Sequence, residues 1–344
     1  MTVRGHKNFS RISMAGLLAL AAQTAAVRGE PVAQENGTIT VLFENDIFYH
    51  ADRDYTNGVQ LAWTSPTLAA GDWAVDLADK LPFFSYRSEV RKTYALGQDI
   101  FTPSDISLQN PPLDDHPYAG FLYGAIGVLG KTPGEGGHLD RLDQVQLQFG
   151  MIGPASLAEQ TQKLVHSIFN DTKPEGWDTQ LHNEPGLELT YERSWRYRVK
   201  LFQDLELQAD PHVGGALGNV YIFANAGAMA RLGFNLPDDF GPVRVDPSLP
   251  GSYYFEPRKE GALGGYAFVG VDGRAVARNI FLDGNTFASS RHVDKENFVA
   301  DFQYGAAVTY DRFRLTYTHV FRTREFTTQR GADQFGAISL SVRY

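Results

Sequence analysis

The chain ends in the stretch GAISLSVRY, residues 336–344, in which apolar and polar side chains alternate. One face carries Ile338 and, at the last position, Tyr344, whereas the other carries Ser339 and Arg343. A period of two indicates an extended strand, because successive strand side chains point to opposite sides. A last strand of this kind, ending in an aromatic residue, favours an outer-membrane β-barrel.

The same period recurs along the chain and predicts an all-β fold, a transmembrane antiparallel β-barrel of about 12 strands. We expect strands at residues 38–43, 59–64, 94–101, 118–129, 144–149, 187–192, 201–207, 220–232, 262–282, 298–310, 314–320 and 336–344. If Asp272-Gly273 were a hairpin turn, the segment 262–282 would contain two strands and the barrel would have more than 12. The connection at 235–261 falls on the periplasmic side, where turns are normally short, so we expect one strand in the middle of the chain to be misassigned.

A secreted β-sandwich would show the same alternation, with the apolar faces turned inward. The barrel is favoured because backbone groups in lipid must be paired, which only helices and closed barrels achieve. No apolar run of about 18 residues or more follows residue 29, so no spanning helix is expected.

Residues 1–29 have the pattern of a secretory signal peptide, with basic Arg4 and Lys7, an apolar run at 14–22 and small residues before cleavage after Ala26 or Gly29. The mature barrel is therefore expected to span residues 30–344 as one domain. The chain has no cysteine, so an exported protein of this kind forms no disulfide. Its formal net charge of -9 argues against a nucleic-acid partner.

The connection between the first two strands is rich in oxygen-bearing side chains. It includes Glu44, Asn45, Asp46, Thr56 and Asn57. Such a set suits calcium, which takes about six to eight oxygen ligands. Asn, Asp and Gly are also the usual turn residues, so a plain acidic turn is the alternative.

The segment 153–183 falls at the outer end of the barrel and contains the one clear helix, which begins near Pro154 and runs to Phe169. Gln162 and His166 lie four residues apart, and hence on one helix face. Histidine suits proton transfer near neutral pH, and the glutamine could orient it or a water. We expect the apolar side chains to pack against the barrel mouth; they are Leu157, Leu164, Val165 and Ile168. The alternative is a surface helix with an incidental histidine.

Short motifs follow one another from residue 37 to the end of the chain. They are END at 44–46, DYTNG at 54–58, FTP at 101–103, HPYAG at 116–120, Gln162 with His166, GWD at 176–178, NEP at 183–185 and LGNVY at 217–221. In this order they resemble the LpxR-type outer-membrane lipid A 3'-O-deacylases. The resemblance implies a calcium-dependent carboxylic ester hydrolase in a Gram-negative outer membrane. It would act as a monomer and remove the 3'-linked acyloxyacyl group from lipid A of lipopolysaccharide in the outer leaflet, at the extracellular rim.

The resemblance also implies the site residues. The catalytic residues carried over by motif are His166, Gln162, Asn45, Thr56 and Glu175, and Asp46 is the calcium ligand. For the acidic residue after the helix, Asp171 is the alternative to Glu175. A lysine of some family members corresponds to Asp99 here, so the resemblance carries no cationic contact to this position. In the expected mechanism His166 takes a proton from water and the calcium ion polarises the ester carbonyl.

Two other functions remain open. A phospholipase-type esterase would need a serine or water site, and a pore or binding barrel would need only a polar lumen. We expect His116 and His182 to be structural, and the pairs Asp114-Asp115 and Asp238-Asp239 to lie in solvated loops.

Overall fold

The structure is a computed structural model that describes residues 36–45, 54–85, 88–134, 139–169, 172–202, 204–245 and 251–344. The predicted signal peptide, residues 1–29, lies outside the described residues. Among the residues that are described, no helix is long and apolar enough to cross a membrane.

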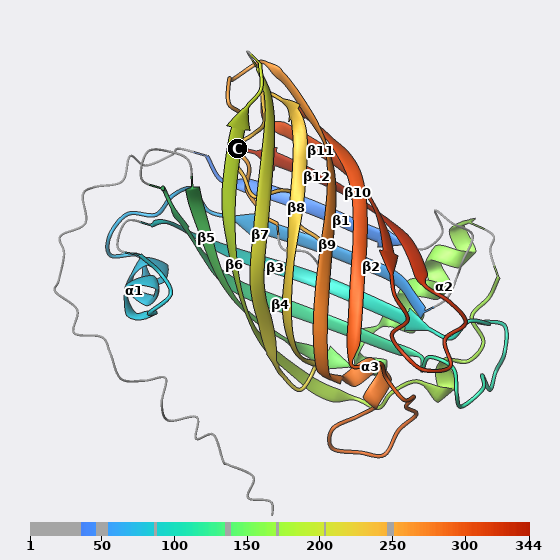
Figure 1. The fold of residues 1–344 in the computed structure, drawn as a ribbon. Helices are drawn as coiled ribbons and strands as arrows, with labels where there is room; N and C mark the ends of the chain where they lie inside the picture. The colour runs from blue at the N-terminus through green and yellow to red at the C-terminus, as the bar shows by residue number, and fades with distance from the viewer. Residues whose placement is uncertain are drawn as a thin grey trace, which may run out of the picture.

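Twelve antiparallel strands form one closed barrel in which each strand pairs with its sequence neighbours and β1 pairs with β12 (Figure 1). The strands are β1 (Thr38–Asn45), β2 (Asp54–Thr64), β3 (Glu89–Thr102), β4 (Ala119–Thr132), β5 (Leu139–Ile152), β6 (Glu184–Lys200), β7 (Leu205–Gly218), β8 (Tyr221–Phe234), β9 (Leu263–Asn279), β10 (Phe298–Tyr310), β11 (Phe313–Arg322) and β12 (Asp333–Arg343). Closure sets Thr38 opposite Arg343 and Asn45 opposite Gly336. The predicted barrel is therefore confirmed, and residues 262–282 contain a single strand.

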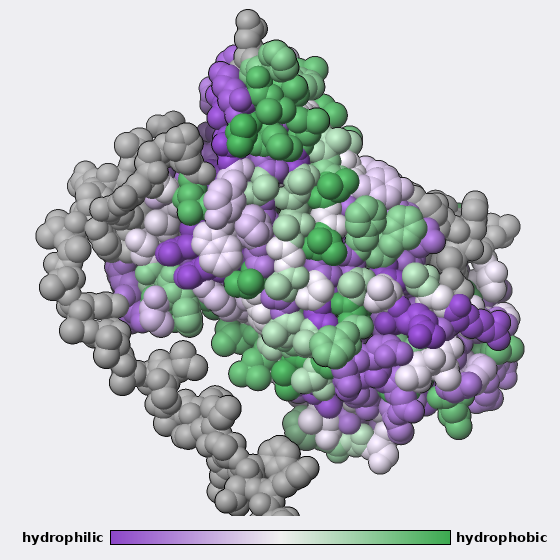
Figure 2. All heavy atoms as spheres, viewed as in Figure 1, coloured by the Kyte–Doolittle hydropathy of each residue, from purple (hydrophilic) through white to green (hydrophobic). Residues whose placement is uncertain are grey.

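The alternation along each strand separates a polar lumen from an apolar outer wall. On β1, Thr38 and Thr40 are buried, whereas Ile39 and Val41 are 41% and 47% exposed. Figure 2 shows apolar and weakly polar side chains along the wall, and strongly hydrophilic ones gathered at the end of the barrel near α3 (Ile280–Asp283). This distribution is the one expected when lipid, rather than the protein core, covers the apolar face.

The strand predicted at residues 201–207 is wrong, because the chain turns there and β7 begins at Leu205. Pro211 lies inside β7 and cannot donate a backbone hydrogen bond. The β6–β7 pairing is interrupted at this point, between the pairs Ser194–His212 and Tyr197–Ala209. The proline and the neighbouring charged residue Asp210 hide the alternation that marks the other strands.

The connection between β8 and β9 enters the barrel. The expectation that one strand in the middle of the chain is misassigned is confirmed at residues 201–207. The long connection at 235–261 was not a sign of that error, because it packs inside the barrel instead of forming a turn. Residues 238–245 and 251–256, here called the lumen segment, contact the inner wall. The Thr40 hydroxyl donates to the Tyr253 carbonyl at 3.2 Å, and Gln144 donates to the Gly251 carbonyl at 3.0 Å.

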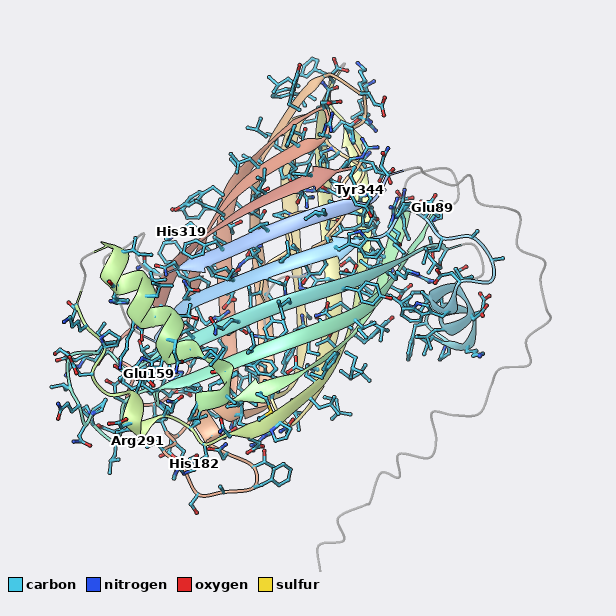
Figure 3. All side chains as sticks on the ribbon, turned by 180° about the vertical axis from the view of Figure 1, so that it is seen from behind. Glu89, Glu159, His182, Arg291, His319 and Tyr344 are labelled. Atoms are coloured by element: carbon cyan, nitrogen blue, oxygen red, sulfur yellow. The ribbon has the colours of Figure 1, made fainter. Side chains whose placement is uncertain are left out.

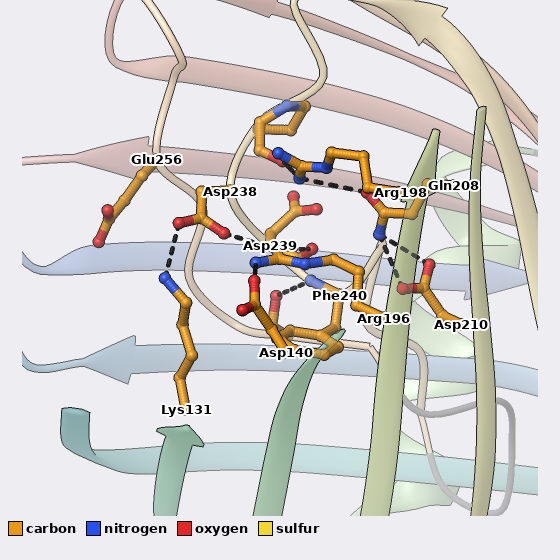
Figure 4. A network of polar contacts seen from close by, with 12 residues as sticks. Lys131, Asp140, Arg196, Arg198, Gln208, Asp210, Asp238, Asp239, Phe240 and Glu256 are labelled. Atoms are coloured by element: carbon orange, nitrogen blue, oxygen red, sulfur yellow. Dashed lines mark hydrogen bonds and ion pairs between the residues drawn. The ribbon is translucent and has the colours of Figure 1, made fainter. Parts of the chain in front are cut away.

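Asp238 and Asp239 were expected in a solvated loop, and this expectation is wrong. Asp238 binds Lys131 at 2.6 Å and also pairs with Arg196 (Figure 4). Asp239 is fully buried and pairs with Arg231 and Arg314. Burial alone would raise the pKa of Asp239, but these two guanidinium groups outweigh it and hold that pKa below its ordinary value. Acidic side chains can be buried here because the lumen wall supplies cations.

Two helices pack on the outside of the same part of the wall. The predicted helix α2 (Ala158–Phe169) lies at one end of β3 and β4, and a helix that was not predicted, α1 (Trp73–Lys80), lies at the other end (Figure 3). Asp72 caps α1 by accepting a hydrogen bond from the Ala74 N–H at 3.0 Å. α1 buries Ala74 and Val75 against the wall.

Candidate active site

A 3-10 turn at Pro154–Ser156 places α2 on the outer wall. Gln98 of β3 donates to the Ser156 carbonyl at 2.6 Å. Below the helix, a side chain on Gly120 would put its Cβ atom 2.2 Å from the Ala158 Cβ atom, so glycine is what permits the close approach. From this start α2 runs from β4 across the outer ends of β3 and β2 toward β1 (Figure 3). The helix thus packs on the outer side of β3 and β4.

The face of α2 that meets the barrel is polar. Ala158, Gln162 and His166, spaced four residues apart, are 1%, 2% and 8% exposed. The apolar residues Leu164 and Ile168 are instead 62% and 67% exposed. The expectation that Leu157, Leu164 and Ile168 pack against the barrel mouth is therefore wrong. Burying two hydrogen-bonding side chains while leaving leucines outside costs stability, unless lipid contacts the outer face and a ligand uses the inner one.

Gln162 is held by a tryptophan from the following loop. The indole N–H of Trp177 donates to the Gln162 side-chain oxygen at 2.8 Å. Trp177 is itself 1% exposed, and it packs on the ring of Tyr118 with 4.8 Å between ring centroids. The Gln162 amide nitrogen has no hydrogen-bond partner among the described residues. Sequence reasoning did not assign this role to Trp177, and only its place in the GWD motif pointed to it.

His166 is oriented by the backbone after the helix. Its Nδ1 atom lies 2.6 Å from the Thr172 carbonyl oxygen. Because a carbonyl can only accept, Nδ1 carries the proton, and Nε2 is the ring nitrogen that can take one. This contact with Thr172 was not predicted, since a backbone carbonyl leaves no mark in the sequence.

The ends of β1 and β2 at the β1–β2 connection carry two amides. Asn45 and Asn57 are cross-strand partners on β1 and β2, and both are 6% exposed. They continue the outward-facing rows that hold Val41 and Leu61. Thr56 lies at an irregularity where the β2–β3 register shifts between Tyr55 and Asn57. Its side chain, like the whole of Asp46, lies outside what the structure describes.

Comparison with known proteins gives the family. The model of a family described as outer membrane protein LpxR matches residues 11–344. This chain belongs to the LpxR family. It is an outer-membrane protein.

One solved structure supports the fold. The structure of LpxR from Salmonella typhimurium matches with a TM-score of 0.71 at 19% identity, over 89% of this chain and 99% of that one. The β domain of the Bordetella autotransporter BrkA matches with a TM-score of 0.40 at 11% identity, over 90% of this chain and 99% of that one. A search of curated proteins found no match.

Of the two acidic candidates in this LpxR-family chain, Asp171 lies outside the described residues. Glu175 is exposed, and its backbone N–H donates to the Ile106 carbonyl at 2.9 Å. It lies near Lys163, whose pKa is raised above its ordinary value by the hydrogen bond to Glu159 and, less strongly, by Glu175. The Glu175 side chain is therefore part of the charged outer surface around α2.

His116 and His182 lie in loops beside the helix. His116 is buried, its Nδ1 atom lies 2.7 Å from the Pro117 carbonyl, and its ring stacks on Phe101. Burial lowers the pKa of His116 below its ordinary value. His182 is exposed, and its backbone N–H donates to Asn285 at 2.9 Å.

The described residues contain no group of three or more His, Cys, Asp or Glu side chains that could hold a metal ion. Glu44 faces the lumen, and both its oxygens are bound by Arg244 at 3.0 and 3.1 Å. The other oxygen donors of the β1–β2 connection, Asp46, Asp52 and the side chain of Asp54, lie outside the described residues. This donor set is all oxygen, which suits calcium.

Proposed function

We propose that this outer-membrane protein is a lipid A 3'-O-deacylase. The observation that carries the proposal is the buried polar face of α2, a helix that packs on β3 and β4 and buries Gln162 and His166. The buried Gln162 amide nitrogen has no partner among the described residues, and a bound ligand would explain it. Membership of the LpxR family supports the choice of lipid A as that ligand.

In this proposal His166 is the general base. The Thr172 carbonyl holds Nδ1–H, so Nε2 can take a proton from water as the water oxygen attacks the ester carbonyl. When the tetrahedral intermediate collapses, the imidazolium returns the proton to the 3' oxygen of the sugar. The products are a free 3'-hydroxyl and a released acyloxyacyl carboxylic acid.

The other site residues stabilise negative charge on the carbonyl oxygen. Asn45 and Thr56 donate hydrogen bonds, as does the Gln162 amide nitrogen. Asp46 is the proposed calcium ligand, and bound calcium would polarise the ester carbonyl as a Lewis acid. Glu175 contributes through its charge at the outer surface rather than through contact with the imidazole, because Nδ1 is taken by Thr172.

The position of the site fits a lipid headgroup. α2 lies on the outside of the barrel, so a substrate can reach it from the outer leaflet without entering the lumen. Acyl chains can then lie along apolar wall residues such as Leu61 and Leu96, which are 51% and 59% exposed. The lumen segment weighs against a pore, because it occupies part of the interior, where Asp239 pairs with Arg231 of β8 and Arg314 of β11.

A phospholipase-type esterase would use the same site. Ser156, which precedes α2, is fully buried and accepts a hydrogen bond from the Ala158 N–H at 3.4 Å. It therefore does not supply an accessible nucleophile, and a water site is favoured.

The test is mass spectrometry of lipid A from an outer-membrane host that produces this chain, assayed with calcium and with a chelator. The expected result is loss of one acyloxyacyl group from the 3' position with calcium only. Unchanged lipid A in the presence of a folded barrel would refute the proposal. Phospholipid turnover as fast as lipid A turnover would instead favour the phospholipase.

A further inference from the structure

Gln162 is buried beneath α2 at 2% exposure, yet only half of its amide is satisfied. The oxygen accepts from the Trp177 indole N–H at 2.8 Å, whereas the nitrogen has no partner among the described residues. A buried amide nitrogen without a partner costs free energy, so its presence calls for an explanation.

A side-chain amide can be turned over, which exchanges its oxygen and nitrogen. The indole N–H of Trp177 is a donor only, and it can pair with the oxygen but not with the nitrogen. Trp177 therefore selects one of the two orientations. Since the amide is planar, a fixed oxygen also fixes the direction of the N–H groups.

Trp177 is well placed to act as a rigid anchor. It is 1% exposed and belongs to a cluster with Ile100, Tyr118 and Ala158, so the wall, the loop and the helix all hold it. Gly176 precedes it, and a Cβ atom there would lie 2.6 Å from the Tyr118 ring and 2.7 Å from the Leu108 carbonyl. The loop can therefore bring the indole against the helix only with glycine at this position.

We propose that Trp177 is a positioning residue that presents the N–H groups of Gln162, rather than its oxygen, to the carbonyl oxygen of the reacting ester. The inference rests on the proposed deacylase function. His166, one turn later on the same face, would then supply the proton acceptor, while Gln162 supplies a donor for the developing oxyanion. The alternative, in which the Gln162 oxygen orients the imidazole, does not fit, because the Nδ1–H of His166 already donates to the Thr172 carbonyl and Nε2 has no proton to donate to that oxygen.

Trp177→Phe removes the donor and keeps an aromatic ring. We expect kcat on lipopolysaccharide in mixed detergent micelles to fall by about tenfold to a hundredfold, with little change in KM. In a Gln162→Ala background, the same change should have almost no further effect. Tyr118→Phe is the matched control, because it removes a hydroxyl that donates to Ile106 in the same cluster and should leave kcat unchanged.

Gln162→Glu tests the acceptor and the donor roles of the Gln162 amide separately. A carboxylate still accepts from the indole but cannot donate, so the variant should be as inactive as Gln162→Ala. The indole N–H resonance of Trp177, assigned by its loss in Trp177→Phe, reports the bond without any substrate. It should shift in Gln162→Ala and stay near its wild-type position in Gln162→Glu.

Three results would overturn the inference. The first is that the losses of kcat in Trp177→Phe and Gln162→Ala add up in the double variant, and the second is that Gln162→Glu protein is active. The third is that the indole N–H resonance of Trp177 does not shift in Gln162→Ala. Failure of the proposed function looks different. In that case wild-type protein leaves lipopolysaccharide uncut, while the indole resonance still moves as described. The hydrogen bond would then stand and its catalytic role would fall.

Discussion

Two helices cover opposite ends of one strip of the barrel wall, and they bury opposite kinds of side chain. α1 packs Ala74, Val75 and Ala78 against β3 and β4, whereas α2, which contacts the same strands, buries Gln162 and His166. Both helices leave apolar residues on their outer faces. The comparison separates a contact that only fastens a helix from one that also builds a site.

The strongest test of this comparison uses two glycines of β4. A Cβ atom at Gly120 would lie 2.2 Å from the Ala158 Cβ atom, and one at Gly130 would lie 2.5 Å from the ring of Phe84, next to α1. Gly120→Ala should displace α2 and lower kcat/KM about a hundredfold, since a misplacement of about 1 Å can cost that much. Gly130→Ala should disturb only the α1 end and leave kcat/KM unchanged.

The measurement is the rate of lipid A deacylation by both variants in the same micelles, with thermal unfolding followed in parallel. Equal losses of activity would mean that the glycines act through barrel stability alone. The contrast between the two helices would then be lost.

Substitutions on the exposed outer face of α2 should have a smaller effect on activity than the glycine substitutions. Combined Leu164→Gln and Ile168→Gln substitutions on α2 should raise KM roughly tenfold, because these side chains would no longer bury area against substrate acyl chains. The matched pair on α1, Trp73→Gln with Leu77→Gln, should leave KM unchanged. Steady-state kinetics in micelles would show the difference, and an equal rise in KM for both pairs would assign the effect to general lipid contact.

The smallest effect concerns the cap of α1. Burial acts to raise the pKa of Asp72, but the hydrogen bonds from Lys92 and the Ala74 N–H outweigh it and hold this pKa below its ordinary value. Asp72 therefore stabilises α1 above the ordinary aspartate pKa, and the contribution is lost as pH falls through the lowered one. Asp72→Ala should destabilise the helix by about 1 kcal/mol without affecting catalysis.

Hydrogen exchange of residues 73–80 measures this effect. In the wild type, protection of these amides from exchange should be lower at about pH 3 than at about pH 6. In Asp72→Ala, the amides should be less protected than in the wild type at about pH 6, and their protection should change less on acidification. A pH profile shared by both proteins would show that Asp72 is not the titrating group.

Most of the fold could be predicted, because alternation marks each strand wherever one side faces lipid. The prediction failed at β7, where Pro211 interrupts the pattern, and at the lumen segment. Sequence shows that Asp239 is acidic, but not that Arg231 and Arg314 surround it. A barrel interior is polar, so polarity alone does not distinguish an interior residue from a solvated one.

For the candidate site, helical spacing placed Gln162 and His166 on one face of α2, and the structure buries both. The same spacing led to the wrong prediction that Leu164 and Ile168 pack against the barrel. Apolar side chains were assumed to belong to a protein core, whereas on the outside of a membrane barrel they can face lipid. Trp177 and Thr172 were missed because their contacts depend on how the loop after α2 folds back.

The most direct test of the central claim compares purified wild-type protein with His166→Ala on the same lipopolysaccharide, with the products mapped by mass spectrometry. The account predicts release of the 3' acyloxyacyl group by the wild type, and a loss of rate of about a hundredfold or more in a variant that remains a folded barrel. Equal release by both proteins would show that the polar face of α2 is not the active site.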